Sequence, residues 1–198
     1  MVWPAPVTLE GKIVTVIPLS RDHEQDLVVA AGDGELHRLW YTTVPAPENV
    51  ASEIERRLAL QAAGSMLPFA IIDKGSGRAL GMTTYMDVDA INRRVEIGST
   101  WYAKSVQRTG INTECKFLML RHAFEDLECN GVEFRTHYLN TQSRRAIERL
   151  GAKLDGILRQ NRIMPNGTLR DTCVYSIIAP EWPTVKAHLI WQMERPRH

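Results

Sequence analysis

The stretch "SVQRTGINTECKFLMLRHAFEDLE" at residues 105–128 joins a polar, glycine-bearing loop directly to a strongly apolar segment. We predict a helix from Asn112, whose first backbone N–H groups have no partner inside the helix and form a typical anion-binding arrangement. The apolar residues leave only a narrow polar stripe, made of Glu114, Arg121, Glu125 and Glu128. A helix with such a stripe is expected to be buried against a sheet.

The segments around this helix predict an α+β fold. Strands are expected at 93–103 and 131–139, and the helix between them makes these two strands a parallel crossover. Hairpin turns at 74–77 and 165–167 indicate that most other strands are antiparallel. Further strands are expected at 12–19 and on both sides of each hairpin turn. Further helices are expected from Ser20 to Gly32, from Glu48 to Gly64, from Asn140 to Gly151 and from Pro180 onward. We therefore expect one domain, residues 1–198, with a mixed, mostly antiparallel sheet flanked by helices.

Composition excludes several classes of protein. The 198 residues include 24 basic and 23 acidic side chains, so the net charge of +1 argues against a general nucleic-acid binder. No apolar run approaches the roughly 18 residues that a membrane span needs. The three cysteines have no C-x-x-C spacing, which argues against zinc or disulfide frameworks and fits a reducing cytoplasm. The start "MVWPAPVTLEGK" lacks signal-peptide features, and we expect no metal.

The loop before the helix has the chemistry of a phosphate site. Gly110 would let the backbone approach a ligand, and Lys104 and Arg108 would add positive charge to the N–H groups of Ile111, Asn112 and Thr113. The alternative is an ordinary strand-to-helix turn with solvated cations. Two nucleotide-binding motifs are excluded, because the dinucleotide fingerprint needs three glycines and the Walker pattern occurs nowhere in the chain.

Two motifs, in order, carry a family resemblance. "QRTGIN" at 107–112 resembles the [QR]-x-x-G-x-[GA] coenzyme A loop of the GNAT N-acetyltransferase superfamily, with Asn112 where Gly or Ala is usual. "NTQSRRAIERLGAKLDGILR" at 140–159 resembles the second motif of the same family, closest to its Rim-type branch of ribosomal-protein N-terminal acetyltransferases and small-molecule relatives. The resemblance implies a GNAT-like sheet with splayed central parallel strands. It also implies direct transfer of an acetyl group from acetyl-CoA to a primary amine in a ternary complex, without a metal.

The resemblance assigns the residues that would hold coenzyme A. The pyrophosphate would lie on the backbone of the loop, and the pantetheine arm would lie between the splayed strands at 95–103 and 132–139. Asn140 would bind this arm through its side-chain amide, or would cap the following helix, or both. The full set of expected cofactor-binding residues is Trp101, Tyr102, Ala103, Gln107, Arg108, Thr109, Gly110, Ile111, Asn112, Thr113, Asn140 and Ser143.

Candidate catalytic residues follow from the same comparison. Many family members place a proton-donating Tyr seven residues after the Asn, where this chain has Ile147. Ser143 matches the Ser of the Rim-type branch and would donate a hydrogen bond to the leaving thiolate. Glu96 is the first candidate for the base that deprotonates the amine, or else a solvated outward residue. His37 and His137 are the alternatives.

The acceptor side is less defined. The loop before the second helix lines the acceptor pocket in relatives, so Trp40 and Tyr41 would form an apolar wall, unless they simply anchor the loop in the core. The expected partner is an amine-bearing small molecule or a peptide N-terminus, and the family's habit of pairing through C-terminal strands allows a homodimer. Since Ile147 replaces the Tyr, a catalytically silent acyl-CoA-binding or interaction protein on the same fold is the alternative function.

Overall fold

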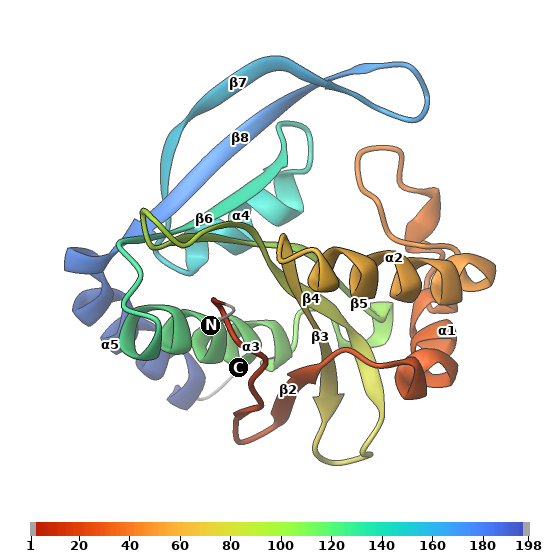
Figure 1. Ribbon diagram of the computed structural model, residues 1–198, viewed down its shortest axis with the longest axis horizontal. Helices are drawn as coiled ribbons and strands as arrows, with labels where there is room; N and C mark the ends of the chain where they lie inside the picture. The colour runs from red at the N-terminus through yellow and green to blue at the C-terminus, as the bar shows by residue number, and fades with distance from the viewer. Residues whose placement is uncertain (1–2, 196–198) are drawn as a thin grey trace.

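Eight strands form one mixed sheet in the order β1-β2-β3-β4-β5-β6-β8-β7, seen in a computed structural model that describes residues 3–195 (Figure 1). Only the β5–β6 pair is parallel, and all other neighbouring strands are antiparallel. The predicted α+β class and the mixed sheet are therefore confirmed. The strands are β1 Leu9–Glu10, β2 Val14–Pro18, β3 Met66–Asp73, β4 Ala79–Asp89, β5 Arg94–Tyr102, β6 Gly131–His137, β7 Lys153–Ile163 and β8 Leu169–Ile178.

Five α-helices cover the two faces of the sheet in the described part of the chain. One apolar cluster joins α1 and α2 to β3, β4 and β5, and a larger cluster joins α3, α4 and α5 to the other face. The central strand β5 therefore runs between two helical layers (Figure 1). The helices are α1 Glu24–Gly32, α2 Val50–Ala62, α3 Ile111–Arg121, α4 Thr141–Arg149 and α5 Trp182–Glu194.

The order of elements agrees with the sequence prediction, with two local differences. A short strand, β1, precedes the first predicted strand and pairs with it. The helix expected up to residue 128 is α-helical only to Arg121 and continues as a π-helical turn over His122–Asp126. Short 3-10 turns also precede α1, α2 and α5, at Arg21–His23, Pro47–Asn49 and Ala179–Glu181.

Glu114 does not belong to the exposed stripe of α3 that the sequence predicted. Its side chain is 6% exposed, and its two carboxylate oxygens accept the backbone N–H groups of Lys12, Ile13 and Val14 at 2.7–2.8 Å. These three donors lie in the connection between β1 and β2 and at the first residue of β2. The carboxylate is buried because it satisfies backbone groups that would otherwise lose hydrogen bonds to water.

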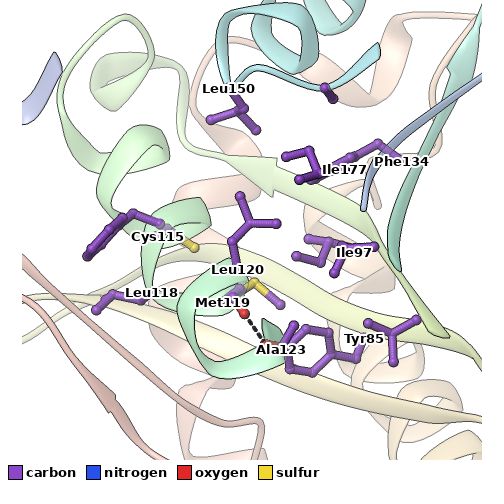
Figure 2. Packing of buried hydrophobic residues seen from close by; sticks show 14 of the residues in the cluster. Tyr85, Ile97, Cys115, Leu118, Met119, Leu120, Ala123, Phe134, Leu150 and Ile177 are labelled. Atoms are coloured by element: carbon purple, nitrogen blue, oxygen red, sulfur yellow. Dashed lines mark hydrogen bonds between the residues drawn. The ribbon is translucent and has the colours of Figure 1, made fainter. Parts of the chain in front are cut away.

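The core between α3 and the sheet fixes the position of the predicted anion loop. Figure 2 shows Met119 and Leu120 of α3 packed toward Ile97 of β5. The hydroxyl group of Tyr85, on β4, is fully buried and donates to the backbone carbonyl oxygen of Met119 at 2.5 Å. Because α3 is held to β4 and β5 in this way, its first turn has a fixed position at the end of β5.

The two parallel strands separate after three residue pairs. Arg94, Val95 and Glu96 of β5 pair with 131–133 of β6, while the strands continue to Tyr102 and His137 without further pairing. The predicted splay is thus present. Backbone groups along the inner edges of both strands are left available to a ligand in the opening.

Residues 3–195 contain neither a candidate membrane span nor a cluster of metal ligands. No helix there has the length and apolar character needed to cross a membrane. No three His, Cys, Asp or Glu side chains in the same residues gather as a metal site would require. The cysteines at 115, 129 and 173 are buried free thiols.

Candidate active site

A cavity of about 1120 Å³ occupies the opening between β5 and β6. Its walls come from α3, α4, the loop at 36–44 and the β7–β8 hairpin, segments that are far apart in the sequence. The cavity brings together most of the residues that the sequence singled out: Tyr41, Glu96, Trp101, Tyr102, Gln107, Arg108, Thr109, Asn112, Thr113, Asn140 and Ser143. The other candidates, His37, Trp40, Ala103, Gly110 and Ile111, are not part of its wall.

The loop before α3 is shaped by Arg108 rather than by Gly110. Arg108 has φ 64°, the left-handed conformation, whereas Gly110 has φ −72° and ψ −17°, which any residue adopts. A left-handed residue in such a turn directs neighbouring N–H groups toward one point, as anion-binding loops do. Within the described residues, the N–H groups of Arg108, Asn112 and Thr113 meet no protein acceptor.

One expected donor of the loop is already used. The Thr109 hydroxyl donates to the carbonyl oxygen of Val106 at 2.6 Å and accepts the N–H of Ile111 at 3.3 Å. The N–H of Ile111 is therefore not available to a phosphate, contrary to the sequence prediction. The side chain of Thr109 instead holds the turn closed.

Basic side chains of α4 and of the residue after α5 surround the loop end of the cavity. Arg145 and Arg149 of α4 line it together with Arg195, which follows α5. Arg149 is fixed by hydrogen bonds to Thr113 at 2.9 Å and to Gln192 at 3.2 Å. Positive charge beside free N–H donors is the combination that binds a pyrophosphate.

The inner edge of β5 offers fewer backbone groups than expected. The N–H of Ala103 donates to Leu80 of β4 at 2.8 Å, so Ala103 is tied to the opposite edge. The carbonyl oxygen of Trp101 also points to β4, because a Cβ on Gly81 would lie 2.1 Å from it. Since backbone groups alternate between the two edges of a strand, Tyr102 is the residue of the predicted three whose backbone faces the opening.

Asn140 and Ser143 meet at the start of α4. The Asn140 side-chain oxygen accepts the N–H of Ser143 at 3.0 Å, so the helix-cap prediction is confirmed. The cap uses only the side-chain oxygen of Asn140. The side-chain amide nitrogen of Asn140 donates no hydrogen bond to any of the residues 3–195. Both side chains line the cavity, so this nitrogen and the Ser143 hydroxyl are donors available to a ligand.

Glu96 is a buried carboxyl on the cavity wall, not a solvated one. Its side chain is on β5, is 5% exposed, and lies 3.6 Å from the guanidinium of Arg135. Burial, with the nearby charge of Asp87, raises the pKa of Glu96 to about 7. A carboxyl with this pKa is well suited to accept a proton near neutral pH.

His137 lines the same cavity but is poorly placed to act as a base. Its Nδ1 accepts the N–H of Leu139 at 3.0 Å, so in the neutral ring the proton is on Nε2. Burial, with the charge of Arg170, lowers the pKa of His137 and keeps the ring neutral. The Nε2 atom finds no partner in the described residues and is a donor, not an acceptor.

The aromatic residues of the 36–44 loop pack beside His137. The Trp40 ring contacts His137 edge-on at 5.2 Å and Tyr41 edge-on at 5.7 Å between ring centroids. Trp40 is 46% exposed and stays behind the wall, while Tyr41 reaches the cavity. Trp40 therefore supports the wall that Tyr41 forms.

The sequence analysis missed several charged residues of the wall. Lys116, on α3, is 5% exposed and donates to Thr83 and Thr100, and burial lowers its pKa to about 8. Arg162 and Arg170, on the β7–β8 hairpin, also line the cavity. The only hint in the sequence that Lys116 is buried is its position between apolar residues of the predicted helix.

The cavity concentrates positive charge. Its wall in the described structure has seven arginines and one lysine, against a single carboxyl group, Glu96, whereas the whole chain has a net charge of +1. Such a surface attracts ligands with several negative charges. The arginines are Arg108, Arg135, Arg145, Arg149, Arg162, Arg170 and Arg195.

The family can be assigned from a comparison with known proteins. The family model described as an acetyltransferase (GNAT) domain matches residues 14–153, well over half of the chain. The chain belongs to the GNAT acetyltransferase family. In this GNAT chain the matched segment runs from the first residue of β2 to the first residue of β7, and includes both the 107–113 loop and α4.

Individual GNAT relatives agree with this assignment. YdaF of Bacillus subtilis (strain 168), which is named as a ribosomal N-acetyltransferase, is 35% identical over 106 residues, and the match covers 54% of this chain and 57% of YdaF. A GCN5-related N-acetyltransferase from Brucella melitensis is 30% identical, with a TM-score of 0.85 over 95% of this chain and 86% of that one. The expected resemblance to the Rim-type branch is confirmed by YdaF.

A second solved structure supports the fold. Mycobacterium smegmatis RimJ, solved in complex with CoA-disulfide, has a TM-score of 0.76 over 96% of this chain and 95% of that chain. Its sequence identity is 24%, so this likeness shows the shared fold alone.

Proposed function

We propose that this chain, as a single domain acting in the cytoplasm, is an N-acetyltransferase that uses acetyl-CoA. It would move the acetyl group directly to a primary amine while both substrates are bound. The observation that carries the proposal is one continuous cavity whose wall includes both the anion-binding loop and the buried carboxyl of Glu96. Donor site and proton acceptor thus share one space, as direct transfer requires.

The residues of the loop end fit coenzyme A. The free N–H groups of Arg108, Asn112 and Thr113 and the start of α3 would hold the pyrophosphate, and Arg145 and Arg149 would add charge-assisted hydrogen bonds. The inner edge of β5 at Tyr102 and the free amide nitrogen of Asn140 would hold the pantetheine arm. When bound, acetyl-CoA supplies an acetyl group already activated as a thioester.

The chain's own residues would manage the protons. Glu96 would accept the proton that an amine must lose before it can attack, and its pKa of about 7 leaves a large fraction of the carboxylate available near neutral pH. Ser143 would donate a hydrogen bond to the leaving sulfur, since Ile147 has no proton to give. Burial of Glu96 also keeps water from competing for it.

The function is tested by thiol release from acetyl-CoA with a panel of small amines, amino acids and peptides with free N-termini. Release that depends on an amine, together with an acetylated product of matching mass, is the expected result. Calorimetry with coenzyme A runs in parallel as a control for binding. Tight coenzyme A binding without transfer to any member of the panel would show a catalytically silent acyl-CoA-binding protein.

The alternative of another nucleotide-binding class has its own test. ATP and NAD are added in competition with coenzyme A for the loop. We expect neither to displace coenzyme A, because the loop has neither the three glycines nor the lysine that those ligands use. Displacement by either nucleotide at similar concentration would contradict the assignment of the loop.

A further inference from the structure

Two arginines face each other across the β7–β8 hairpin at the edge of the cavity. Arg162 and Arg170 are register partners, so their side chains leave the hairpin on the same face. Both side chains line the cavity. Like charges directly opposite each other destabilise a strand pair. The pair is therefore unfavourable by itself, and a bound anion would offset the repulsion.

This pair lies on the face of the sheet that contains the acceptor-side residues. Thr172 is the register partner of His137, and Arg170, two residues away, lies on the same face as Thr172. His137 in turn contacts Trp40 of the 36–44 loop. Tyr175, on the alternate face, belongs to the core that packs against α3 and α4. The two arginines are thus across the sheet from the helix that begins at the coenzyme A loop.

Neither arginine forms an ion pair within residues 3–195. No carboxylate lies within 4.0 Å of either side chain, whereas Arg135 contacts Asp87, Glu96 and Glu133. The Nε of Arg170 donates to Thr172 at 2.9 Å, and this bond orients the guanidinium while the described residues give its terminal nitrogens no acceptor. Burial, with the charge of Arg162, lowers the pKa of Arg170, and the attraction of the more distant Glu96 does not offset this.

We propose that Arg162 and Arg170 bind a carboxylate of the acceptor, so that the preferred acceptor is an amine with an acidic group near its amino group. This inference rests on the proposed acetyl transfer and specifies its substrate class. A guanidinium presents paired donors that match a carboxylate, and two of them converging on one point favour an anion strongly. The amine would then lie toward Glu96, which occupies the same cavity.

The test compares acceptors that differ only in charge. One arm uses alanine against alaninamide, in which the acidic group is the α-carboxylate of a free amino acid. The other arm uses the tripeptide amides Ala-Asp-Ala and Ala-Asn-Ala, in which it is a side chain beside a peptide N-terminus. In the arm whose carboxylate stands at the right distance from the amino group to reach the two arginines, we expect kcat/KM for the acid to exceed that for its amide about tenfold or more. Raised salt should reduce this preference.

The variants are Arg162→Gln and Arg170→Gln, with Arg159→Gln as the matched control. Arg159 is on the same strand as Arg162, is exposed, and pairs with Asp171 outside the cavity wall. Each cavity variant should lower kcat/KM for the acid about tenfold and leave the amide within about twofold, and the control should change neither. Arg162 is exposed, so its replacement tests the inference even if Arg170→Gln fails to fold.

Failure of the inference differs from failure of the proposed function. If wild-type protein acetylates the amides as well as the acids in both arms, or if the preference survives in both cavity variants, the inference is overturned while acetyl transfer stands. If no amine is acetylated, calorimetry decides with N-acetyl-Ala-Asp-Ala amide against its Asn counterpart. Tighter binding of the Asp peptide that is lost in Arg162→Gln supports the anion site, and equal binding overturns it.

Discussion

Arg57 of α2 donates through Nη2 to the backbone carbonyl oxygen of Ser99 on β5, at 3.0 Å. The same guanidinium is 1% exposed and also bonds Glu53 and Thr84. Ser99 has φ 47°, a left-handed conformation on the cavity wall. A buried arginine therefore holds an unfavourable backbone conformation in the strand that carries Glu96.

Replacing this arginine should cost much stability. Arg57→Met leaves the Ser99 carbonyl and the buried Thr84 hydroxyl without this donor and removes one of the two arginines that pair with Glu53. Breaking such a buried network costs roughly 3–5 kcal/mol. Arg56→Met is the matched control, because Arg56 pairs with the same Glu53 but is half-exposed, and such pairs contribute about 1 kcal/mol or less. Urea unfolding of both variants measures the difference. Equal losses would show that burial of Arg57 does not matter.

The pH dependence of transfer should follow Glu96. Because the deprotonated carboxylate is the active form, kcat/KM should rise with pH up to about 7 and then level off. Glu96→Gln should lower kcat about 10²-fold or more and remove the rising limb. The exposed Glu128→Gln serves as the control. A rising limb that persists in Glu96→Gln would assign the base to another residue.

Glu96 should also make the stability of the protein depend on pH. Whereas kcat/KM is expected to rise with pH, the contribution of Glu96 to the free energy of unfolding should fall. Its pKa is raised from 4.5 to about 7 in the folded chain, so the folded state binds more protons than the unfolded state over that range. Its contribution to the free energy of unfolding then falls as pH rises from about 4.5 to 7. At pH 8 we expect Glu96→Gln to raise Tm by at least roughly 2–4 °C, the change that about 1 kcal/mol produces in a chain of this size. Calorimetric scans at pH 5 and pH 8 test this, and a gain that is equal at both would contradict it.

Ser143 should act through its hydroxyl group. Ser143→Ala is expected to lower kcat about tenfold or more with little change in coenzyme A affinity, because a hydrogen bond to a charged group contributes roughly 1.5–3 kcal/mol. Ser143→Thr keeps a hydroxyl at the same position and should retain most of the activity. Single-turnover measurements separate this step from product release. An unchanged kcat in Ser143→Ala would remove Ser143 from the mechanism.

The backbone of the coenzyme A loop can be tested at Arg108. Arg108→Gly and Arg108→Val remove the same charge, but only glycine accepts the left-handed conformation freely. We expect the Kd for coenzyme A to be about tenfold higher in the valine variant than in the glycine variant, since left-handed backbone costs roughly 1–2 kcal/mol with a side chain. Calorimetry with coenzyme A gives both values. Equal affinities would mean that the guanidinium, not the backbone, determines binding.

Much of the fold and the donor site could be predicted from local patterns. The strand–helix–strand unit around residues 105–128 and the spacing of Asn140 and Ser143 are short-range features, and they identified one side of the cavity. Glu114 was misassigned because its partners, Lys12 to Val14, lie about a hundred residues away, beyond any periodicity. The role of Gly110 was also misread, since the sequence cannot show that Arg108 adopts the left-handed conformation next to it.

The acceptor wall was missed for a related reason. The sequence analysis did not single out Arg162 and Arg170, which the register of the hairpin places opposite each other on the cavity side. Lys116 and Arg57 were harder still, as each is buried by partners from other strands. Distant partners therefore decide the burial of Lys116 and Arg57, and a single sequence does not reveal them.

The β7–β8 hairpin lies almost wholly outside the segment that the family model matches, since that segment ends at residue 153, where β7 begins. Figure 1 shows the hairpin as a long ribbon reaching away from the helices. The parts of the cavity assigned here to the donor are thus encoded separately from the pair of arginines assigned to the acceptor. If the proposed roles hold, grafting this hairpin onto a relative should change which amine is modified without altering the coenzyme that is used.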